Sequence, residues 1–249
     1  MGKLYRTGFI SSSGATGTTC LLTGLLIAGL AVTAPGGVAR AESPMQVDDA
    51  STLDRGRLKI ETLYRRDGGR RFTEAVFGVG AFPSVELEIS GGLGQDRDLS
   101  PRADLSGAGL GLKWVPIAQD LGWSLGARYD YGRLRIKPDA PGLRSTETDH
   151  ALTGLATYRF TAGLAAHMNV GVQYGRADGE SDTVGTWGLG VDWAVYGPLT
   201  VIAETYGLDG SSRRALGLRY TIREGLKASA AAGRGQGLSF GQVGVAWEF

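Results

Sequence analysis

The chain has 249 residues, of which 26 are basic and 25 acidic, with a formal net charge of +1 and 42% hydrophobic residues. This length fits one large domain or two small ones, and the hydrophobic content excludes an intrinsically disordered chain. The balanced charge argues against a nucleic-acid partner, because contacts to phosphates need a cationic face.

The first 41 residues are typical of a secretory signal peptide. Lys3 and Arg6 precede an apolar run over residues 21–32, and Ala39-Arg40-Ala41 supplies the small residues of a cleavage site. The run is too short for a membrane-spanning helix, which needs roughly 20 residues. We expect cleavage after Ala41, which leaves a mature chain without cysteine, as is common for proteins of the Gram-negative envelope.

Residues 42–55 are expected to form a short periplasmic N-terminal segment, because alternation of apolar residues begins only near Arg57. From there to the C-terminus the apolar residues recur every second position, which indicates β-strands. We count twelve such segments, near residues 56–64, 71–82, 84–93, 104–114, 122–132, 148–159, 163–174, 184–196, 198–207, 213–222, 225–234 and 240–249. Most have the length of about 9–11 residues that a tilted strand needs to cross a membrane.

The connections between these segments alternate in length. Short turns such as Pro83 and Gly197 alternate with connections that tend to be longer and more polar, notably 94–103, 133–147 and 175–183. Such alternation is the pattern of outer-membrane barrels, which have short periplasmic turns and longer extracellular loops. The sequence therefore predicts an all-β fold, a 12-stranded antiparallel transmembrane β-barrel over residues 56–249, in the bacterial outer membrane.

A soluble secreted β-barrel or sandwich is the alternative, because alternation does not say which face is inside. Three features favour the membrane: aromatic residues gather near strand ends, the opposite faces carry glycine and charge that cannot fill a dry core, and the chain ends on Phe249. Trp247 and Phe249 resemble the C-terminal assembly signal of outer-membrane barrels. The expected partners are therefore outer-membrane lipids, the barrel-assembly machinery and a small-molecule solute.

The faces opposite the apolar ones are expected to line the lumen. A charge that faces lipid at mid-membrane costs roughly 2–4 kcal/mol, so inward placement is favoured. The candidate lumen-lining residues are Glu74, Glu86, Glu88, Lys113, Arg128, Asp130, Arg159, Asp192, Glu204, Arg219, Lys227 and Glu248. These charges either line a passage or only link neighbouring strands across a narrow, wet lumen. Glu248 in the last strand is expected to face Lys227 in the eleventh.

Glycines at positions 107, 109, 111, 188, 190 and 217 fall on the same inward face and leave space there. Twelve strands lie between the filled eight-stranded barrels and the wide 16–18-stranded pores, so a narrow pore and a plugged barrel both fit. Glu86 and Glu88 lie near Lys113, which can neutralise only one of them. The remaining negative charge predicts a weak cation preference.

No catalytic, cofactor or metal site is predicted. His150 and His167 have no serine beside them, and the mature chain lacks the cysteine and histidine set of a zinc site. The glycines of residues 107–111 are spaced by two and no helix follows, so this segment is a strand face and not a phosphate-binding loop.

Several short segments resemble, in order and spacing, the outer-membrane family named for the MetA pathway of phenol degradation, whose members are often labelled transporters. The resembling pieces are residues 79–92 (VGAFPSVELEISGG), 107–114 (GAGLGLKW), 167–174 (HMNVGVQY), 199–207 (LTVIAETYG), 215–221 (ALGLRYT) and 243–249. The resemblance implies a twelve-stranded barrel that passes small organic molecules, aromatic ones among them. It supplies no catalytic residues.

The function that follows is an outer-membrane channel or transporter of small solutes through a narrow charged lumen. A structural or adhesive barrel without conductance is the alternative, and a fully paired, blocked lumen would favour it. A barrel enzyme is the third, weaker alternative.

Overall fold

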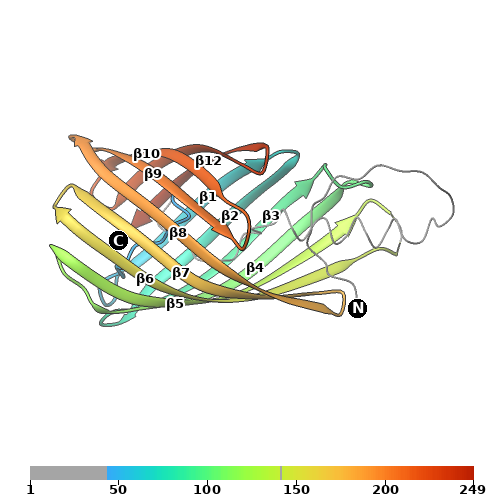
Figure 1. Ribbon diagram of the computed structural model, residues 1–249, viewed down its shortest axis with the longest axis horizontal. Coiled ribbons are helices and arrows are strands. Elements are labelled where there is room, and N and C mark those ends of the chain that lie inside the picture. The colour runs from blue at the N-terminus through green and yellow to red at the C-terminus, as the bar shows by residue number, and fades with distance from the viewer. Residues whose placement is uncertain (1–43, 141) are drawn as a thin grey trace. The chain divides into compact units, whose positions relative to one another are not determined.

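The computed structural model describes residues 44–140 and 142–249, so the predicted signal peptide lies outside the described residues. Twelve antiparallel strands form one closed barrel in which each strand pairs with its neighbours in sequence and β1 pairs with β12 (Figure 1). The strands are β1 (Leu58–Asp67), β2 (Arg70–Phe82), β3 (Val85–Asp96), β4 (Ala103–Ile117), β5 (Gly122–Pro138), β6 (Ser145–Thr161), β7 (Leu164–Ala177), β8 (Glu180–Tyr196), β9 (Leu199–Leu208), β10 (Arg213–Arg223), β11 (Leu226–Gly235) and β12 (Leu238–Glu248). No described helix is long and apolar enough to span a membrane.

The predicted strand count and order are confirmed, but the strands of the central hairpins are longer than expected. β7 and β8 are joined by only Asp178 and Gly179, whose φ angles are +49° and +91°. Two positive φ angles are the requirement of a two-residue type I′ hairpin turn, for which Asp-Gly is a preferred sequence. The predicted loop over residues 175–183 is therefore mostly strand.

The first and last strands pair with each other and close the barrel. We call the end of the barrel where β1 begins and β12 ends the terminal end. Leu58 and Phe249 exchange two backbone hydrogen bonds of 2.8 and 2.9 Å, and Lys59 lies opposite Glu248 in the next pair. The turns at this terminal end are short. The longest connections, residues 97–102 and 139–144, lie at the opposite end, which we call the loop end.

Side chains alternate between the two faces of the barrel wall as the sequence predicts. On β10, Leu216 and Leu218 are exposed on the outside, whereas Gly217 and Arg219 are buried inside. Exposed apolar and aromatic side chains of this kind form a band around the barrel. Because each strand carries them on the face away from the buried charges, the outside of the barrel is apolar and its inside is polar.

On β5 the pattern inverts near the loop end. The outward face runs through apolar and aromatic residues from Trp123 to Tyr131, and continues with Arg133, Arg135 and Lys137. The inward side chains at this level are apolar instead: Leu134 and Ile136 are buried with Ala103 and Leu105 of β4. The inward face is therefore polar in the middle of the barrel and apolar at this part of the loop end.

Candidate functional site: an occupied lumen

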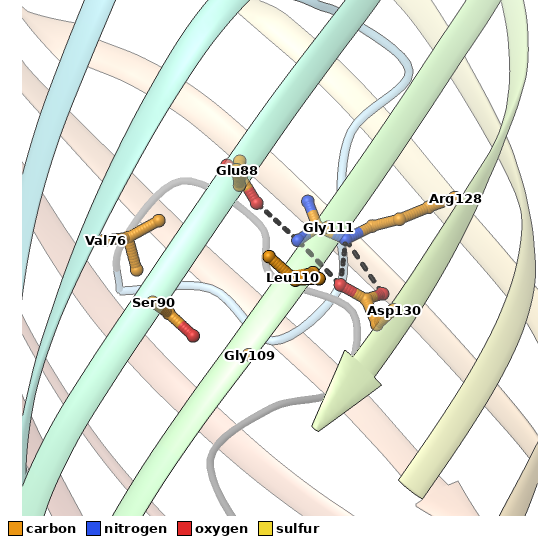
Figure 2. A pocket seen from close by; sticks show the side chains of 8 residues that line it. All are labelled: Val76, Glu88, Ser90, Gly109, Leu110, Gly111, Arg128 and Asp130. Carbon is orange, nitrogen blue, oxygen red and sulfur yellow. Dashed lines mark hydrogen bonds and ion pairs between the residues drawn. The ribbon is translucent and has the colours of Figure 1, made fainter. Parts of the chain in front are cut away.

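A network of ion pairs covers the inner wall of β1 to β5. Arg128 places Nη2 2.5 Å from Glu88 Oε2 and Nε 3.0 Å from both carboxylate oxygens of Asp130 (Figure 2). Lys59 places Nζ 2.9 Å from Glu86 and 2.7 Å from Glu88. The space left between these groups has a volume of about 10 Å³, enough for roughly one water molecule. These five groups carry two positive and three negative charges, so the ion pairs compensate most of the charge on this part of the inner wall.

Residues 44–54, which we call the lumenal segment, lie inside the barrel and are held by inward-facing side chains. Glu204 of β9 accepts hydrogen bonds from the backbone N–H groups of Gln46 and Val47 at 2.7 and 3.0 Å. Thr157 of β6 accepts one from Ala50 at 2.8 Å. Since the lumenal segment belongs to no sheet, these side chains satisfy backbone groups that would otherwise be buried without partners.

Asp48 is the most heavily bonded residue of the lumenal segment. Its carboxylate lies 2.8 Å from Lys113 Nζ and 3.4 Å from Arg128 Nη1, and its side chain is fully buried. The Asn169 side chain closes a reciprocal pair with the Asp48 backbone: its Oδ1 accepts from the N–H at 2.6 Å and its Nδ2 donates to the C=O at 2.8 Å. Asp48 therefore links β4, β5 and β7 across the lumen.

Apolar side chains and glycines complete the fit. Met45 and Val47 pack against Ile202 and the half-buried Tyr206 of β9. A Cβ atom added at Gly188 would lie 2.8 Å from Val47 Cγ2, and one at Gly217 would lie 3.0 Å from Pro44 Cγ. The inward glycines do leave space, as the sequence predicts, and the chain's own residues occupy part of it.

Two expectations differ from this arrangement. The predicted periplasmic segment 42–55 instead lies against lumenal side chains over its residues 44–54, because its backbone and carboxylate groups find partners there. The premise of the predicted negative excess, that Lys113 is the base that pairs with Glu86 or Glu88, is wrong. Lys59 and Arg128 form the ion pairs with the two glutamates, whereas Lys113 pairs with Asp48 and Asp49.

The structure places all twelve predicted lumen-lining residues on the inward face. Eight are buried and four are half-buried; the half-buried ones are Arg159, Asp192, Lys227 and Glu248. Lys227 and Glu248 form the predicted pair, at 3.4 Å. The role of the twelve in passage stays a prediction. Sequence reasoning missed the lumenal segment, because residues 44–54 carry no periodic pattern.

His167 has the partners that an enzyme reading would look for. Its Nδ1 lies 3.0 Å from Thr157 Oγ1 and its Nε2 lies 3.3 Å from Asp192 Oδ1. The Thr157 hydroxyl is fully buried and also accepts the N–H of Ala50. In this arrangement Thr157 holds the lumenal segment, and its hydroxyl is closed to a substrate.

Comparison with solved structures shows what this barrel is similar to. The KdgM porin in complex with disordered oligogalacturonate matches with a TM-score of 0.58 at 13% identity, over 77% of this chain and 99% of that chain. The NanC porin matches with a TM-score of 0.56 at 11% identity, over 76% and 98%. The COG4313 outer membrane channel from Pseudomonas putida F1 matches with a TM-score of 0.53 at 10% identity, over 81% and 98%. The chain therefore has the fold of the bacterial outer-membrane β-barrels. In such barrels the short turns lie at the periplasmic end, which corresponds to the terminal end here.

Sequence relatives add little to this assignment. Residues 143–235 match the model of a family described as uncharacterised conserved protein UCP029691. No curated protein matches the sequence. The resemblance to the family named for the MetA pathway is not confirmed by these matches, and it stays a prediction.

Weakening the central anchor should loosen the lumenal segment. Asp48→Asn removes the buried counter-charge of Lys113 and Arg128, which we expect to cost on the order of 2–3 kcal/mol of segment binding. A Gln46→Cys reporter in the mature chain should then react faster with a water-soluble thiol reagent. Asp182→Asn, at an exposed position near the loop end, is the matched control and should leave the rate unchanged. Equal rates in all three proteins would contradict the anchoring role of Asp48.

Proposed function

We propose that this barrel is an outer-membrane channel for small solutes whose lumen is closed by its own residues 44–54. The observation that carries the proposal is the way the lumenal segment is held. Its described polar contacts run to side chains such as Glu204 and Asn169, and not to the hydrogen-bond ladder of the wall. The segment can therefore leave without breaking any strand pairing.

Departure of the segment would expose a polar surface that water can solvate. Glu204, Asn169 and Thr157 would exchange backbone partners for water, so each hydrogen bond lost costs only about 1 kcal/mol net. The contacts of Met45 and Val47 are the main apolar loss. The space beside Gly188 and Gly217 would open at the same time. Similarity to porins and channels at 10–13% identity supports the barrel fold. Among the functions that this fold can serve, the passage of solutes is the one that fits this lumen.

The solute class follows from lumen size and charge. Twelve strands enclose a lumen narrower than that of the general porins, so small molecules are the expected solutes. Once Asp48 and Asp49 leave, Lys113 loses both of its acidic partners from the segment. We expect an anionic group of the solute to take their place. Transport of aromatic compounds rests on the sequence resemblance alone.

A structural barrel without conductance is the second candidate. The observation that favours it is the lumen itself, in which the charges of β1 to β5 are paired and the centre is occupied. The two candidates differ in one property, which is whether the lumenal segment ever leaves.

Ion selectivity tests whether current passes along this wall. In a barrel lacking residues 44–54, Glu86→Gln combined with Glu88→Gln would leave Lys59 and Arg128 without these counter-charges. We expect reversal potentials in a salt gradient to shift toward anions, since rings of charged side chains set ion preference in pores. Equal substitution of exposed Asp182 and Glu180 near the loop end is the control. Conductance with an unchanged reversal potential would place the current path elsewhere.

The assembly role of the last residues is a further part of this proposal. Deleting Phe249 removes the two backbone hydrogen bonds to Leu58 and the ring contact with Trp247, whose centroid lies 4.7 Å away. We expect much less heat-modifiable barrel in the outer-membrane fraction, because both barrel closure and recognition by the assembly machinery would suffer. Phe249→Tyr keeps the backbone and an aromatic ring, and should assemble normally. Normal assembly after the deletion would argue against the signal.

A further inference from the structure

The outside of the barrel carries an uncompensated basic belt at the loop end. Eight exposed basic residues point outward from the strands there, and Asp104 is the single outward acidic residue of the described strands at that level. None of these eight residues forms an ion pair with another residue of the ranges 44–140 and 142–249. At the periplasmic end, by contrast, the outward faces end in aromatic or aliphatic side chains, and Arg223 lies over the Trp247 ring. The belt consists of Arg66, Arg71, Arg133, Arg135, Lys137, Arg176, Arg214 and Arg234.

One part of this belt is hollowed into a groove of about 600 Å³ across β1 to β5. Arg71, Arg135 and Lys137 are among its lining residues, and Thr73 and Ser106 contribute short polar side chains. The strand register aligns these positions, because Arg71 lies opposite Gln95, Gln95 opposite Asp104, and Asp104 opposite Lys137. The amide of Gln95 donates to Asp104 at 3.2 Å, which engages the one acidic group of the groove.

The groove continues toward the apolar band. The next aligned outward positions are Thr73, Leu93 and Ser106, of which Leu93 is an exposed apolar side chain. After them come Ala75, Gly91 and Ala108, which leave the wall almost bare. Phe77, Ile89 and Leu110 follow in the apolar band itself. A ligand seated in the groove would thus have cations at one end and bilayer at the other, which is the chemistry of an anionic lipid.

The height of the cations selects the type of lipid. Arg135 lies four residues beyond Tyr131, the last aromatic residue of the outward face of β5, which is about 10 Å above the band for a strand tilted by about 40°. The headgroup layer of an ordinary bilayer is only about 5–7 Å thick on each side. A phosphate on a sugar headgroup reaches this height, whereas a glycerophospholipid phosphate falls below it.

We infer that this groove binds the phosphorylated glycolipid of the outer leaflet, with its phosphate between Arg71, Arg135 and Lys137 and its acyl chains along the strip of small residues. The site lies on the outer wall, so it is independent of any passage through the lumen. It gives the barrel a fixed lipid neighbour at β2 to β5.

The mature barrel in phosphatidylcholine nanodiscs, titrated with lipid A, tests the inference. Arg135→Gln combined with Lys137→Gln should weaken lipid A binding by about tenfold or more, given the contribution of each basic residue near an anionic lipid. Arg214→Gln combined with Arg234→Gln removes two aligned cations of the same belt outside the groove, and should leave the affinity nearly unchanged. Ser106→Phe keeps every charge, fills the groove and should also weaken binding.

Three outcomes would overturn the inference. Equal loss in the two double variants would mean that the belt attracts anionic lipid without a specific site. Unchanged binding in Ser106→Phe would mean that the groove is not the seat of the lipid. If phosphatidylglycerol binds as tightly as lipid A, the height of the cations does not distinguish a glycolipid from a glycerophospholipid.

Discussion

A barrel without its lumenal segment should conduct, whereas the complete mature barrel should be closed for most of the time. Removing residues 44–54 takes away Asp48, which links three strands across the lumen, and the side chains that fill the space beside Gly188 and Gly217. We expect single-channel conductance in planar bilayers to rise on the order of tenfold or more, because a twelve-stranded barrel is wide enough for a narrow aqueous path.

A second variant separates loss of contacts from a change in chain length. Replacing residues 44–54 with Gly and Ser residues of the same number keeps the length and removes Asp48, Met45 and Val47. This barrel should conduct like the deletion variant, and both should remain heat-modifiable. If folded barrels of both kinds stay closed, the channel proposal fails and a structural barrel becomes the better description.

The largest effect on assembly should come from a charge on the outer face. Leu218 is 50% exposed in the middle of the outward apolar run of β10, and lies opposite Val201 of β9 and Ala230 of β11. Leu218→Arg should cost roughly 2–4 kcal/mol, the price of an arginine at mid-membrane depth. The free energy of unfolding in vesicles by urea measures this loss. Leu218→Met is the matched control, since it changes shape and leaves the face apolar.

The neighbouring inward position should behave differently. A side chain at Gly217 would meet Pro44 Cγ 3.0 Å from its Cβ, so Gly217→Arg should assemble and displace the lumenal segment. We expect this variant to be inserted, with faster thiol labelling of the Gln46→Cys reporter. An insertion defect as large as that of Leu218→Arg would mean that the two faces are misassigned.

The local pattern of residues was sufficient to predict the wall of this barrel. Alternation such as Leu216, Leu218 and Tyr220 against Gly217 and Arg219 has a period of two, which depends only on adjacent residues. Strand number, strand order and the pairing of Lys227 with Glu248 follow from this period and from antiparallel neighbours. For the same reason the inward charges could be named from the sequence, once the apolar face was assigned to lipid.

Only the tertiary structure decided what fills the lumen. The lumenal segment has no period, and its partners lie far along the chain: 158 residues separate Gln46 from Glu204, and 121 separate Asp48 from Asn169. Such contacts form only when the barrel has closed, so no local signal reports them. For this reason Lys113 pairs with Asp48 and Asp49, whereas the sequence predicts Glu86 or Glu88 as its partner. The inversion of β5 beyond Tyr131 is of the same kind, because a period of two describes alternation but does not say which face meets water.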